Sequence, residues 1–483
     1  YRNDNRIETY ESGTAPCKTA CPAHVAVQGY LKLAAQGRYD EALALIKREN
    51  PLPAICGRVC NRRCEDACTR GRVDAAVAID EVKKFIAQRD LDAATRYVPP
   101  VVTPTRAGGF DQKIAIIGAG PAGLSCAFYL AEKGYKPVVF EKNERQGGML
   151  TYGIPSFKLQ KDVIEAEVEV IRLMGAEFRY GVEVGRDVTL DELRAQGFKA
   201  FYVAIGCQGG RLAGIPGEDA EDVTVAVDFL REVNSGKIDS LSGRTIVVGG
   251  GNVAIDVARN ACRLGSEHVE MFCLESEAQM PASEEERREA VEDGAHISCG
   301  WGPKEIHLDE AGRVCGITFK RCTRVFDDEG RFAPEYDEND LRRVDADRVV
   351  MSIGQSIVWG DLLAGSKVEL GRGQGALADP QTYQTAEPDI FVGGDVYTGP
   401  SFAIDAIAAG HEAAVSIHRF VQPGSTLTIG RNQRRYTALD RDDVVLEGYD
   451  NASREVAHVD REREKAAPFS EYVETFTEEQ VRA

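Results

Sequence analysis

The feature that most constrains this chain is a glycine pattern directly after a short apolar run. Ile114 to Ile117 is typical of a buried parallel strand, and Gly118, Gly120 and Gly123 follow it in the spacing G-x-G-x-x-G. The first glycine allows a sharp turn, the second lets the backbone approach a pyrophosphate, and the third lets the next helix pack on the strand. The start of that helix offers unpaired N–H groups to an anion. The pattern therefore predicts a phosphate cradle between a strand and a helix.

The residues that follow extend this cradle to a whole dinucleotide. A second apolar strand, Pro137 to Phe140, ends in Glu141, where a carboxylate can accept hydrogen bonds from ribose hydroxyls. The glycine pattern alone is weak evidence, because an ordinary tight turn can carry it. Here strand, helix, second strand and terminal acid occur in register. We therefore predict a dinucleotide site, with Pro121, Ala122 and Lys142 as further contacts.

The same pattern occurs a second time. Thr245 to Val248 is apolar, and Gly249 to Ala254 forms G-x-G-x-x-A at the start of a helix predicted over Val253 to Leu264. The next predicted strand, His268 to Leu274, ends in Glu275. Two such folds in one chain imply two dinucleotides. The candidate contacts of the second are Gly249, Gly251, Asn252, Val253, Ala254 and Glu275.

Further candidates lie in glycine-containing segments near predicted strand ends. Gly147 to Pro155 has too few charges for a solvated loop and is expected to lie against a cofactor. The apolar strands Ala200 to Ile205 and Val349 to Ile353 each end at a glycine, and Ile390 to Val392 leads to a Gly-Asp pair before a helix predicted over Phe402 to Phe420. A carboxylate there suits ribityl or ribose hydroxyls. These segments add Gly148, Met149, Leu150, Ile154, Gly206, Gly354, Gly394 and Asp395.

Cysteines are concentrated at the N-terminal end. Six of the thirteen occur in the first 68 residues, namely Cys17, Cys21, Cys56, Cys60, Cys64 and Cys68. The last four are each four residues apart, so on one helix their thiols would share a face. Cys17-x3-Cys21-Pro22 matches the end of the ferredoxin run C-x2-C-x2-C-x3-C-P, in which the last cysteine serves a different cluster from its neighbours. We predict one or two iron–sulfur clusters in a small helical domain.

Two alternative roles for these cysteines stay open. Zinc binding is one, although tetrahedral zinc sites favour C-x2-C pairs that this segment lacks. A buried cysteine stripe is the other, but the residues between the cysteines are mostly charged or polar and leave little else to bury. Structural disulfides are not expected in a compartment that keeps thiols reduced.

Composition excludes several classes of protein. A chain of 483 residues suggests about three domains. Lys and Arg number 58 against 77 Asp and Glu, and the net charge of −19 would repel nucleic acid and anionic membranes. No apolar run approaches the roughly 20 residues of a membrane span, and the first residues do not show a charged-then-apolar signal pattern. We expect a cytoplasmic protein with no nucleic-acid partner and no membrane span.

These motifs, in this order, resemble a family that contains the glutamate synthase small (β) subunit, the N-terminal half of dihydropyrimidine dehydrogenase and the large subunit of NADH-dependent ferredoxin:NADP oxidoreductase. The motifs that carry the resemblance lie between about residues 15 and 422. They are Cys17-x3-Cys21-Pro22, Cys60 to Cys68, Gly118 to Gly123, Gly147 to Pro155 with Phe157 and Lys158, Gly249 to Ala254, and Gly393 to Asp395. The resemblance implies FAD in the first Rossmann fold, NAD(P)H in a second one inserted into it, and electron exit through [4Fe-4S] clusters.

The chain departs from the family at the cluster ligands. The family carries C-x2-C shortly before C-x3-C-P, whereas residues 1–16 here contain no cysteine. Where family members often place a Glu or Gln ligand, this chain has Lys83, with Glu81 two positions earlier. Cys56 therefore becomes a candidate fourth ligand.

Together these inferences predict an α/β protein with two Rossmann-type domains after a helical iron–sulfur domain. The predicted limits are 1–108 for the iron–sulfur domain, 109–218 and 355–422 for the FAD domain, 219–354 for the NAD(P) domain and 423–483 for an extended tail. We expect an NAD(P)H oxidoreductase in which FAD exchanges a hydride with the nicotinamide and single electrons with the clusters. Its partners would be iron–sulfur subunits or ferredoxin in a hetero-oligomer.

Two other functional classes share parts of this pattern. A thioredoxin-reductase-like enzyme needs a redox-active C-x2-C in the nicotinamide domain, and the cysteines there form no such pair. An electron-wiring module with a degenerate nicotinamide site stays possible, because Asn252 replaces a more usual acidic residue. Reduction of the flavin by NADH would distinguish the predicted NAD(P)H oxidoreductase from such an electron-wiring module.

The cluster domain is expected to be incomplete by itself. Two all-cysteine [4Fe-4S] clusters need eight thiolates, and the domain offers six. In the ferredoxin pattern the last cysteine serves a different cluster from its neighbours, so Cys21 would join Cys60 and Cys64 in one cluster. Cys17 and Cys68 would then belong to a second cluster, whose remaining two ligands, a C-x2-C pair, are missing. The chain opens on Tyr1, and a capping box at Thr477 to Gln480 stands close to its end. We expect the missing ligands beyond Ala483 or on a partner; one cluster and a natural end at Ala483 is the alternative.

The residue at the end of the second strand predicts which nicotinamide cofactor is used. A 2′-phosphate is bound by arginines, whereas a free 2′-hydroxyl is bound by a carboxylate. Because Glu275 would repel the phosphate, we expect a higher kcat/KM for NADH than for NADPH in steady-state assays. Arg259 and Arg263 on the neighbouring helix could still reach a phosphate. A preference for NADPH would contradict the argument from Glu275.

Overall fold

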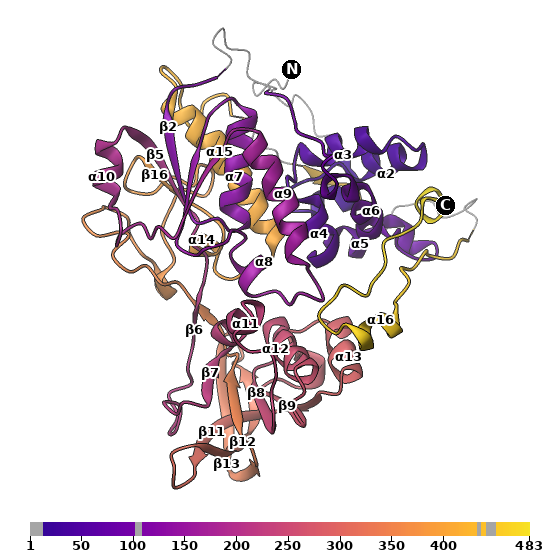
Figure 1. Cartoon of the computed structure of the whole chain (residues 1–483), viewed down its shortest axis with the longest axis vertical. Coiled ribbons are helices and arrows are strands. Elements are labelled where there is room, and N and C mark those ends of the chain that lie inside the picture. The colour runs from indigo at the N-terminus through magenta and orange to yellow at the C-terminus, as the bar shows by residue number, and fades with distance from the viewer. Residues whose placement is uncertain (1–12, 102–108, 432–435, 441–450) are drawn as a thin grey trace. The chain divides into compact units, whose positions relative to one another are not determined.

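The computed structural model describes residues 13–101, 109–431, 436–440 and 451–483, and the chain divides into two compact units. The first unit contains residues 1–151, 157–207 and 357–483, and the second contains 152–156 and 208–356. The second is therefore inserted in the sequence of the first, and Figure 1 labels many of the elements of both. The domain limits given above stay predictions. The prolines and glycines of Tyr97 to Gly109 predict a linker, and part of it lies outside the described residues.

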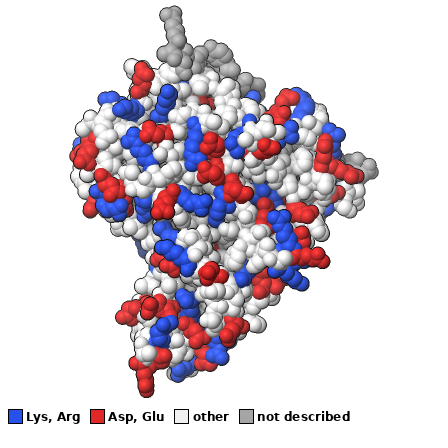
Figure 2. All heavy atoms as spheres, viewed as in Figure 1, with Lys and Arg blue, Asp and Glu red and all other residues white. Residues whose placement is uncertain are grey.

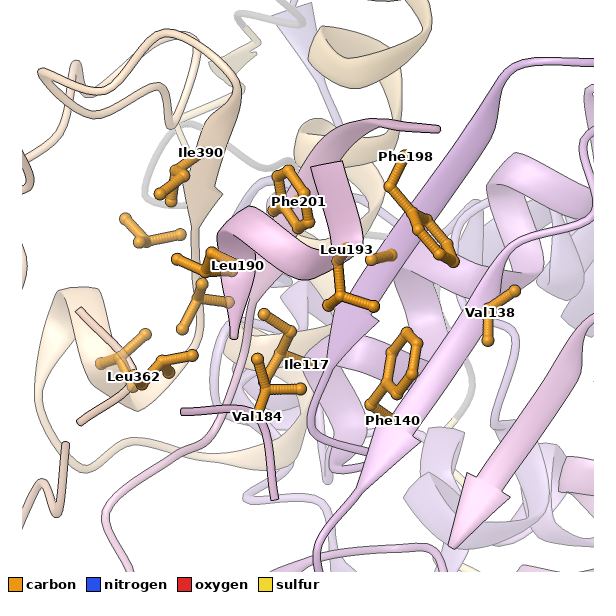
Figure 3. Packing of buried hydrophobic residues seen from close by; sticks show 14 of the residues in the cluster. Ile117, Val138, Phe140, Val184, Leu190, Leu193, Phe198, Phe201, Leu362 and Ile390 are labelled. Carbon is orange, nitrogen blue, oxygen red and sulfur yellow. The ribbon is translucent and has the colours of Figure 1, made fainter. Parts of the chain in front are cut away.

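A five-stranded parallel sheet in the order β16-β5-β2-β3-β4 forms the centre of the first unit. Helices α7 and α15 pack together on one face, and α10 lies on the other (Figure 1). On the α10 side, Leu190 and Leu193 pack with Phe140 and Phe198 in a buried apolar cluster (Figure 3). The elements are β2 (Lys113–Ile117), α7 (Pro121–Glu132), β3 (Val138–Glu141), α8 (Met149–Tyr152), α9 (Lys161–Leu173), β4 (Glu177–Tyr180), α10 (Leu190–Ala195), β5 (Phe198–Val203), β16 (Ile390–Val392), α14 (Asp395–Thr398) and α15 (Ala403–Val421).

The second unit repeats this arrangement. Its parallel sheet has the order β10-β9-β8-β14-β7, so that β8, like β2, is the central strand. Phe272 and Phe319 stack at 3.9 Å in its core. The elements are β6 (Gly209–Gly210), β7 (Val223–Val225), α11 (Ala226–Asn234), β8 (Arg244–Val248), α12 (Asn252–Arg263), β9 (His268–Cys273), η2 (Glu277–Gln279), α13 (Glu284–Glu292), β10 (His296–Cys299), β14 (Arg348–Met351) and β15 (Gln355–Ser356).

A three-stranded antiparallel sheet in the second unit was not foreseen from the sequence. It consists of β11 (Trp301–Leu308), β12 (Val314–Phe326) and β13 (Phe332–Val344). Strand β13 is rich in charged residues and largely exposed. It therefore lacks the apolar alternation by which a half-buried strand is recognised.

The N-terminal cysteines lie on short helices of the first unit or directly at their ends. The elements are α1 (Pro16–Ala20), α2 (Val27–Ala35), α3 (Tyr39–Lys47), α4 (Pro53–Val59), α5 (Arg63–Asp66), η1 (Thr69–Arg72) and α6 (Ile79–Leu91). The expectation of one helix carrying Cys56 to Cys68 is wrong. Helix α4 ends at Val59, and Arg62 adopts a left-handed conformation with φ 54° before α5 begins. A residue with positive φ cannot continue a right-handed helix, so the four thiols do not form one stripe.

Buried charges connect the N-terminal helices α1 to α6, here called the cysteine domain, to the Rossmann-type part of the first unit. The carboxylate of Glu167 on α9 accepts hydrogen bonds from the backbone N–H groups of Ala54, at 2.7 Å, and Ile55, at 2.9 Å, at the start of α4. Burial, followed by the charge of Asp90, raises the pKa of Glu167 to about 8. Asp90 also pairs with Lys47 at 2.5 Å, and both side chains are almost completely buried. The hydroxyl of Tyr129 on α7 donates to the Lys47 carbonyl at 3.2 Å.

The C-terminal segment packs against the same cysteine domain. Glu471 pairs with Arg58 at 3.0 Å and with Lys84 at 2.8 Å, and the Lys84 amine also donates to the Val473 carbonyl. The segment contains α16 (Arg461–Ala466) and α17 (Glu478–Arg482). The capping box predicted at Thr477 is confirmed. The remaining strands, β1 (Gly13–Thr14) and β17 (Thr437–Ala438), pair in parallel near α1.

Most predicted elements are confirmed within a residue or two. Helices expected to begin at residues 253 and 402 begin at 252 and 403. Ser283 caps α13 by accepting from Glu286 N–H. Within the described residues, no helix has both the length and the apolar composition that a membrane crossing requires.

The Glu167 carboxylate gives the first prediction from the fold. Glu167→Ala leaves two buried N–H groups of α4 without their acceptor, at a cost of roughly 1–3 kcal/mol each. We expect a lower free energy of unfolding for the first unit, measured by urea denaturation.

A matched control lies on the same helix. Glu165 is half exposed and pairs with Arg172, so Glu165→Ala should change stability by less than about 1 kcal/mol. Equal effects of the two variants would contradict the capping role of Glu167.

Candidate cofactor and cluster sites

The turn from β2 into α7 is built as the sequence predicted. A Cβ at Gly118, whose φ is +104°, would lie 2.5 Å from the Ala204 carbonyl oxygen, and a Cβ at Gly123 would lie 2.0 Å from the Gly118 oxygen. A Cβ at Gly120 would meet nothing within 4 Å. The outer glycines are therefore required by close packing, whereas the space beside Gly120 is open. An open approach at the middle glycine fits a bound pyrophosphate.

A second glycine-rich loop lies against this turn. Gly147 N–H donates to the Ala119 carbonyl at 2.8 Å. A Cβ at Gly148 would lie 3.1 Å from the Gly120 Cα. The structure thus brings Gly148 and the start of α8, with Met149 and the buried Leu150, to the first cradle.

Two carboxylates border the first cradle. Glu141 is 2% exposed, and its oxygens accept from the N–H groups of Ala119 at 2.8 Å and Asn143 at 2.9 Å. Glu141 thereby fixes the glycine turn as well as ending β3. Asp395 follows Gly394 after β16, and a Cβ at Gly206 would lie 4.0 Å from its Oδ2. Burial raises the pKa of Asp395 to about 6.

The other residues predicted at this site fall into two groups. Pro121 is the first residue of α7, Ala122 is buried beside it, and Lys142 is half-buried after Glu141. Ile154 instead belongs to the segment 152–156, which is part of the second unit. The structure does not group it with the first cradle.

The second cradle has the same construction. A Cβ at Gly249, whose φ is +144°, would lie 2.2 Å from the Ser352 carbonyl oxygen, whereas one at Gly251 would meet nothing within 4 Å. Asn252, Val253 and the buried Ala254 open α12. The Asn252 side-chain oxygen accepts from Ser283 N–H at 3.2 Å, which ties the turn to the start of α13.

Glu275 lies beside this second cradle. Its Oε2 is 3.0 Å from the Cβ position of Gly250. The two arginines that could have offset its charge are paired elsewhere: Arg259, 1% exposed, and Arg263 contact Asp293 at 2.7 Å and 2.8 Å. Gly354, with φ +124°, is exposed after β14 and lies near Arg211.

The cysteines form two electrostatic neighbourhoods. Burial raises the pKa of Cys17, and Cys68 is the next cause. Burial also raises the pKa values of Cys60 and Cys64, and both thiols interact with Lys83, Asp80 and Cys21. Cys17 interacts mainly with Cys68 and less with Cys21, whereas Cys60 and Cys64 both interact with Cys21, and the ligand sets inferred from the ferredoxin pattern stay a prediction. Cys56 is 1% exposed, and its thiol lies 3.8 Å from Asn50 Oδ1.

A buried ion pair lies among these thiols. Lys83 pairs with Asp80, one helical turn before it on α6, and the two residues are 6% and 2% exposed. Burial opposes the charge on Lys83, but Asp80, Cys60 and Cys56 raise its pKa well above the usual value. Sequence reasoning singled out Lys83 but missed Asp80. Asp80 and Lys83 are three residues apart in the sequence, and this spacing could have indicated an ion pair on one helix.

The arrangement of these groups does not match a site for one metal ion. In the part of the chain that the structure describes, no three His, Cys, Asp or Glu side chains could hold a single ion. Cys56, Cys60 and Cys64 each interact with the buried Lys83, which suits a larger anionic group, such as an iron–sulfur cluster bound by thiolates.

Comparison with known families identifies the two parts of the chain. Residues 112–410 match the family described as pyridine nucleotide-disulphide oxidoreductase. The chain belongs to this family. Residues 9–95 match the family described as dihydropyrimidine dehydrogenase domain II, 4Fe-4S cluster. Members of the first family use FAD and NAD(P)H, so the chain is an oxidoreductase with FAD, NAD(P)H and a 4Fe-4S cluster.

Curated relatives support this assignment over most of the chain. The β subunit of NADP(+)-dependent formate dehydrogenase from Moorella thermoacetica is 35% identical over 96% of this chain and 68% of its own length. The small chain of glutamate synthase [NADPH] from Escherichia coli K12 is 36% identical over 85% of this chain and 89% of its own length. PreT, a subunit of NAD-dependent dihydropyrimidine dehydrogenase from Escherichia coli O157:H7, is 32% identical over 84% of this chain and 91% of its own length. All three are named as subunits or chains of larger enzymes.

A solved structure shows the same fold. FprA from Mycobacterium tuberculosis in complex with NADPH aligns with a TM-score of 0.55 and 19% identity, over 64% of this chain and 84% of FprA. At this identity the likeness concerns the fold alone. It agrees with the predicted α/β class with Rossmann-type domains.

The contrast between Gly120 and Gly123 predicts two distinct variant phenotypes. Gly120→Ala adds a methyl group to open space, so we expect a folded protein that retains less FAD. Gly123→Ala would place Cβ against a backbone oxygen, so we expect loss of soluble protein. Flavin-to-protein absorbance ratios and circular dichroism measure both outcomes. Normal FAD content in Gly120→Ala would contradict the assignment of the first cradle.

Proposed function

We propose that this chain is the nicotinamide-oxidising electron-transfer subunit of a larger iron–sulfur enzyme. NADH binds at the cradle of Gly249, Gly251 and Glu275, and FAD at that of Gly118, Gly120 and Asp395. FAD, when bound, accepts a hydride from the nicotinamide and passes single electrons to an iron–sulfur cluster. The chain's own residues bind and orient the groups, and no side-chain acid or base is needed for hydride transfer.

The proposal is carried by one observation: the flavin cradle and the cysteine domain belong to the same compact unit and share buried contacts. Helix α7 begins in the cradle and reaches α3 through the Tyr129–Lys47 hydrogen bond. On its neighbour α15, His411 stacks on Tyr129 at 3.7 Å, and Asp405 pairs with Arg63 next to Cys64. Such packing holds two redox groups at a fixed separation, as electron transfer between them requires.

The cysteine neighbourhoods suggest how the cluster ligands are shared. Cys21, Cys60 and Cys64 would bind one [4Fe-4S] cluster, with Cys56 as its fourth ligand. Cys17 and Cys68 would contribute to a second cluster, whose other ligands lie outside the described cysteine domain. Lys83 would offset part of the negative charge that thiolates bring to the first cluster.

NADH is the proposed cofactor in preference to NADPH. The glutamate synthase small chain is named for NADPH and PreT for NAD, so the names of relatives support either cofactor. In this chain Glu275 lies at the second cradle, while Arg259 and Arg263 already pair with Asp293. A 2′-phosphate at this position would meet the like charge of Glu275.

The electron acceptor would be an iron–sulfur subunit or ferredoxin, within a cytoplasmic hetero-oligomer. The names of the relatives support a multi-subunit enzyme. No two of the thirteen cysteines form a disulfide, which suits a reducing compartment. Figure 2 shows both signs of charge mixed over the visible face, without a continuous basic field for nucleic acid.

Anaerobic titration with NADH tests the proposed activity. We expect the flavin absorbance to bleach first and the broad cluster absorbance to decrease afterwards, with NADPH less effective at equal concentration. Gly251→Ala should raise KM for NADH and leave FAD and iron contents unchanged. A flavin that dithionite reduces and neither nicotinamide reduces would instead support an electron-wiring module with a degenerate nicotinamide site.

The fourth ligand of the first cluster can be tested separately. We expect Cys56→Ala to lower the iron content and to give the electron paramagnetic resonance signal of a three-iron cluster after mild oxidation. Cys126→Ala, which removes a buried thiol of α7 outside the cysteine domain, is the control and should keep full iron. Full iron in Cys56→Ala together with loss in Asp80→Ala would assign the fourth ligand to Asp80 instead.

A further inference from the structure

The ends of β9 and β10 bring two thiols together in the second unit. Cys273 is the last residue of β9, Cys299 is the last residue of β10, and the two are register partners in the parallel ladder. Register partners on neighbouring parallel strands project from the same face of the sheet. Their Sγ atoms are 3.7 Å apart, and both are free thiols. The sequence does not reveal this pair, because the two cysteines are too far apart to belong to one short motif.

The thiol pair lies directly beside the second cradle. The Cys273 Cβ is 2.9 Å from the Cβ position of Gly250, the middle residue of the glycine turn. The Cys273 thiol donates to the Glu275 carbonyl at 3.6 Å, and Gly300 N–H donates to the same carbonyl at 2.9 Å. The ends of both strands are thus tied to the backbone of Glu275, whose carboxylate faces Gly250.

The two thiols differ in exposure. Cys273 is 2% exposed, whereas Cys299 is half-buried. Burial, followed by the neighbouring Cys299, raises the pKa of Cys273. A small oxidant would therefore reach Cys299 first, and Cys273 would be present as a protonated thiol in contact with it.

We propose that Cys273 and Cys299 form an oxidation site that closes to a disulfide and weakens nicotinamide binding at the second cradle. The oxidant is a small peroxide such as hydrogen peroxide. The Cys299 sulfur gives two electrons to the peroxide and becomes a sulfenic acid with release of one water. The Cys273 thiol then attacks that sulfur, and its proton leaves with the hydroxyl group as a second water. Two thiols and one peroxide thus give one disulfide and two waters.

The geometry gives the expected consequence of closure. A disulfide bond is about 2.05 Å long, so the two sulfur atoms, 3.7 Å apart here, must approach each other. The Cys273 Cβ lies beside the Cβ position of Gly250, and closure removes the thiol hydrogen that Cys273 donates to the Glu275 carbonyl, so we expect the movement to extend beyond the sulfurs. It shifts the middle of the glycine turn and the carboxylate beside it. The effect on NADH binding rests on the proposed function of this cradle, whereas disulfide formation does not.

The test uses the full chain with its cofactors. The protein is treated anaerobically with hydrogen peroxide and desalted, and peptide mapping by mass spectrometry determines which cysteines are linked. We expect a Cys273–Cys299 cross-link that dithiothreitol reverses, and an increase of about fivefold or more in KM for NADH, measured by flavin bleaching. Cys299→Ser should keep its original KM after the same treatment.

Controls separate this effect from damage to the clusters. Cys315→Ser removes a half-buried thiol of β12 and should remain as sensitive to peroxide as the unaltered protein. Cluster damage should be equal in all variants, so only the difference between Cys299→Ser and the unaltered protein reports on the pair. Absence of the cross-link, or a cross-link that leaves KM unchanged, would overturn the proposal. A flavin that NADH fails to reduce before any oxidation would instead refute the proposed function, and the cross-link would still be measurable.

Discussion

The close approach of helix α7 to its neighbours is the constraint on which the first unit depends. At one end, a side chain at position 123 would collide with the Gly118 carbonyl of the turn. On the opposite side, a Cβ at Gly410 of α15 would lie 2.2 Å from the Ala122 carbonyl oxygen, and the Ser125 hydroxyl donates to the Ile407 carbonyl at 2.7 Å. Because α7 is held this closely on both sides, its N-terminus and the open space beside Gly120 are fixed.

The same helix connects the cradle to the cysteine domain. Its Tyr129 contacts the Lys47 backbone, and Lys47, Asp90 and Glu167 form a buried set of charges. Burial raises the pKa of Glu167, and the charge of Asp90 raises it further, because the two carboxylates share one ammonium group. The helix α4 N–H groups offset part of this cost by donating to Glu167. A buried polar contact of this kind fixes orientation more strictly than apolar packing does, since its loss leaves donors unpaired.

The glycine patterns predicted both turns well, because a strand-to-helix turn needs residues without a side chain at these positions. The strand ends carrying Glu141, Glu275 and Asp395 were predicted for the same reason. The cysteine pattern was predicted as a set of cluster ligands, but the single helix inferred from its spacing was wrong. Arg62 interrupts that helix in a left-handed conformation that spacing does not reveal. The antiparallel sheet was missed because its outer strand, β13, is polar and exposed.

The sequence by itself determined the chemistry available to this protein: two glycine turns of the dinucleotide-binding type, a group of N-terminal thiols, and a carboxylate just after the strand that follows the second turn. These depend on short segments whose backbone geometry or donor atoms follow from residue type. Only the tertiary structure decided which distant residues meet. It paired Arg259 with Asp293, placed Asp80 and Lys83 among the thiols, and brought Cys273 within 3.7 Å of Cys299. Such contacts depend on strand register and helix packing across many residues, which no local pattern encodes.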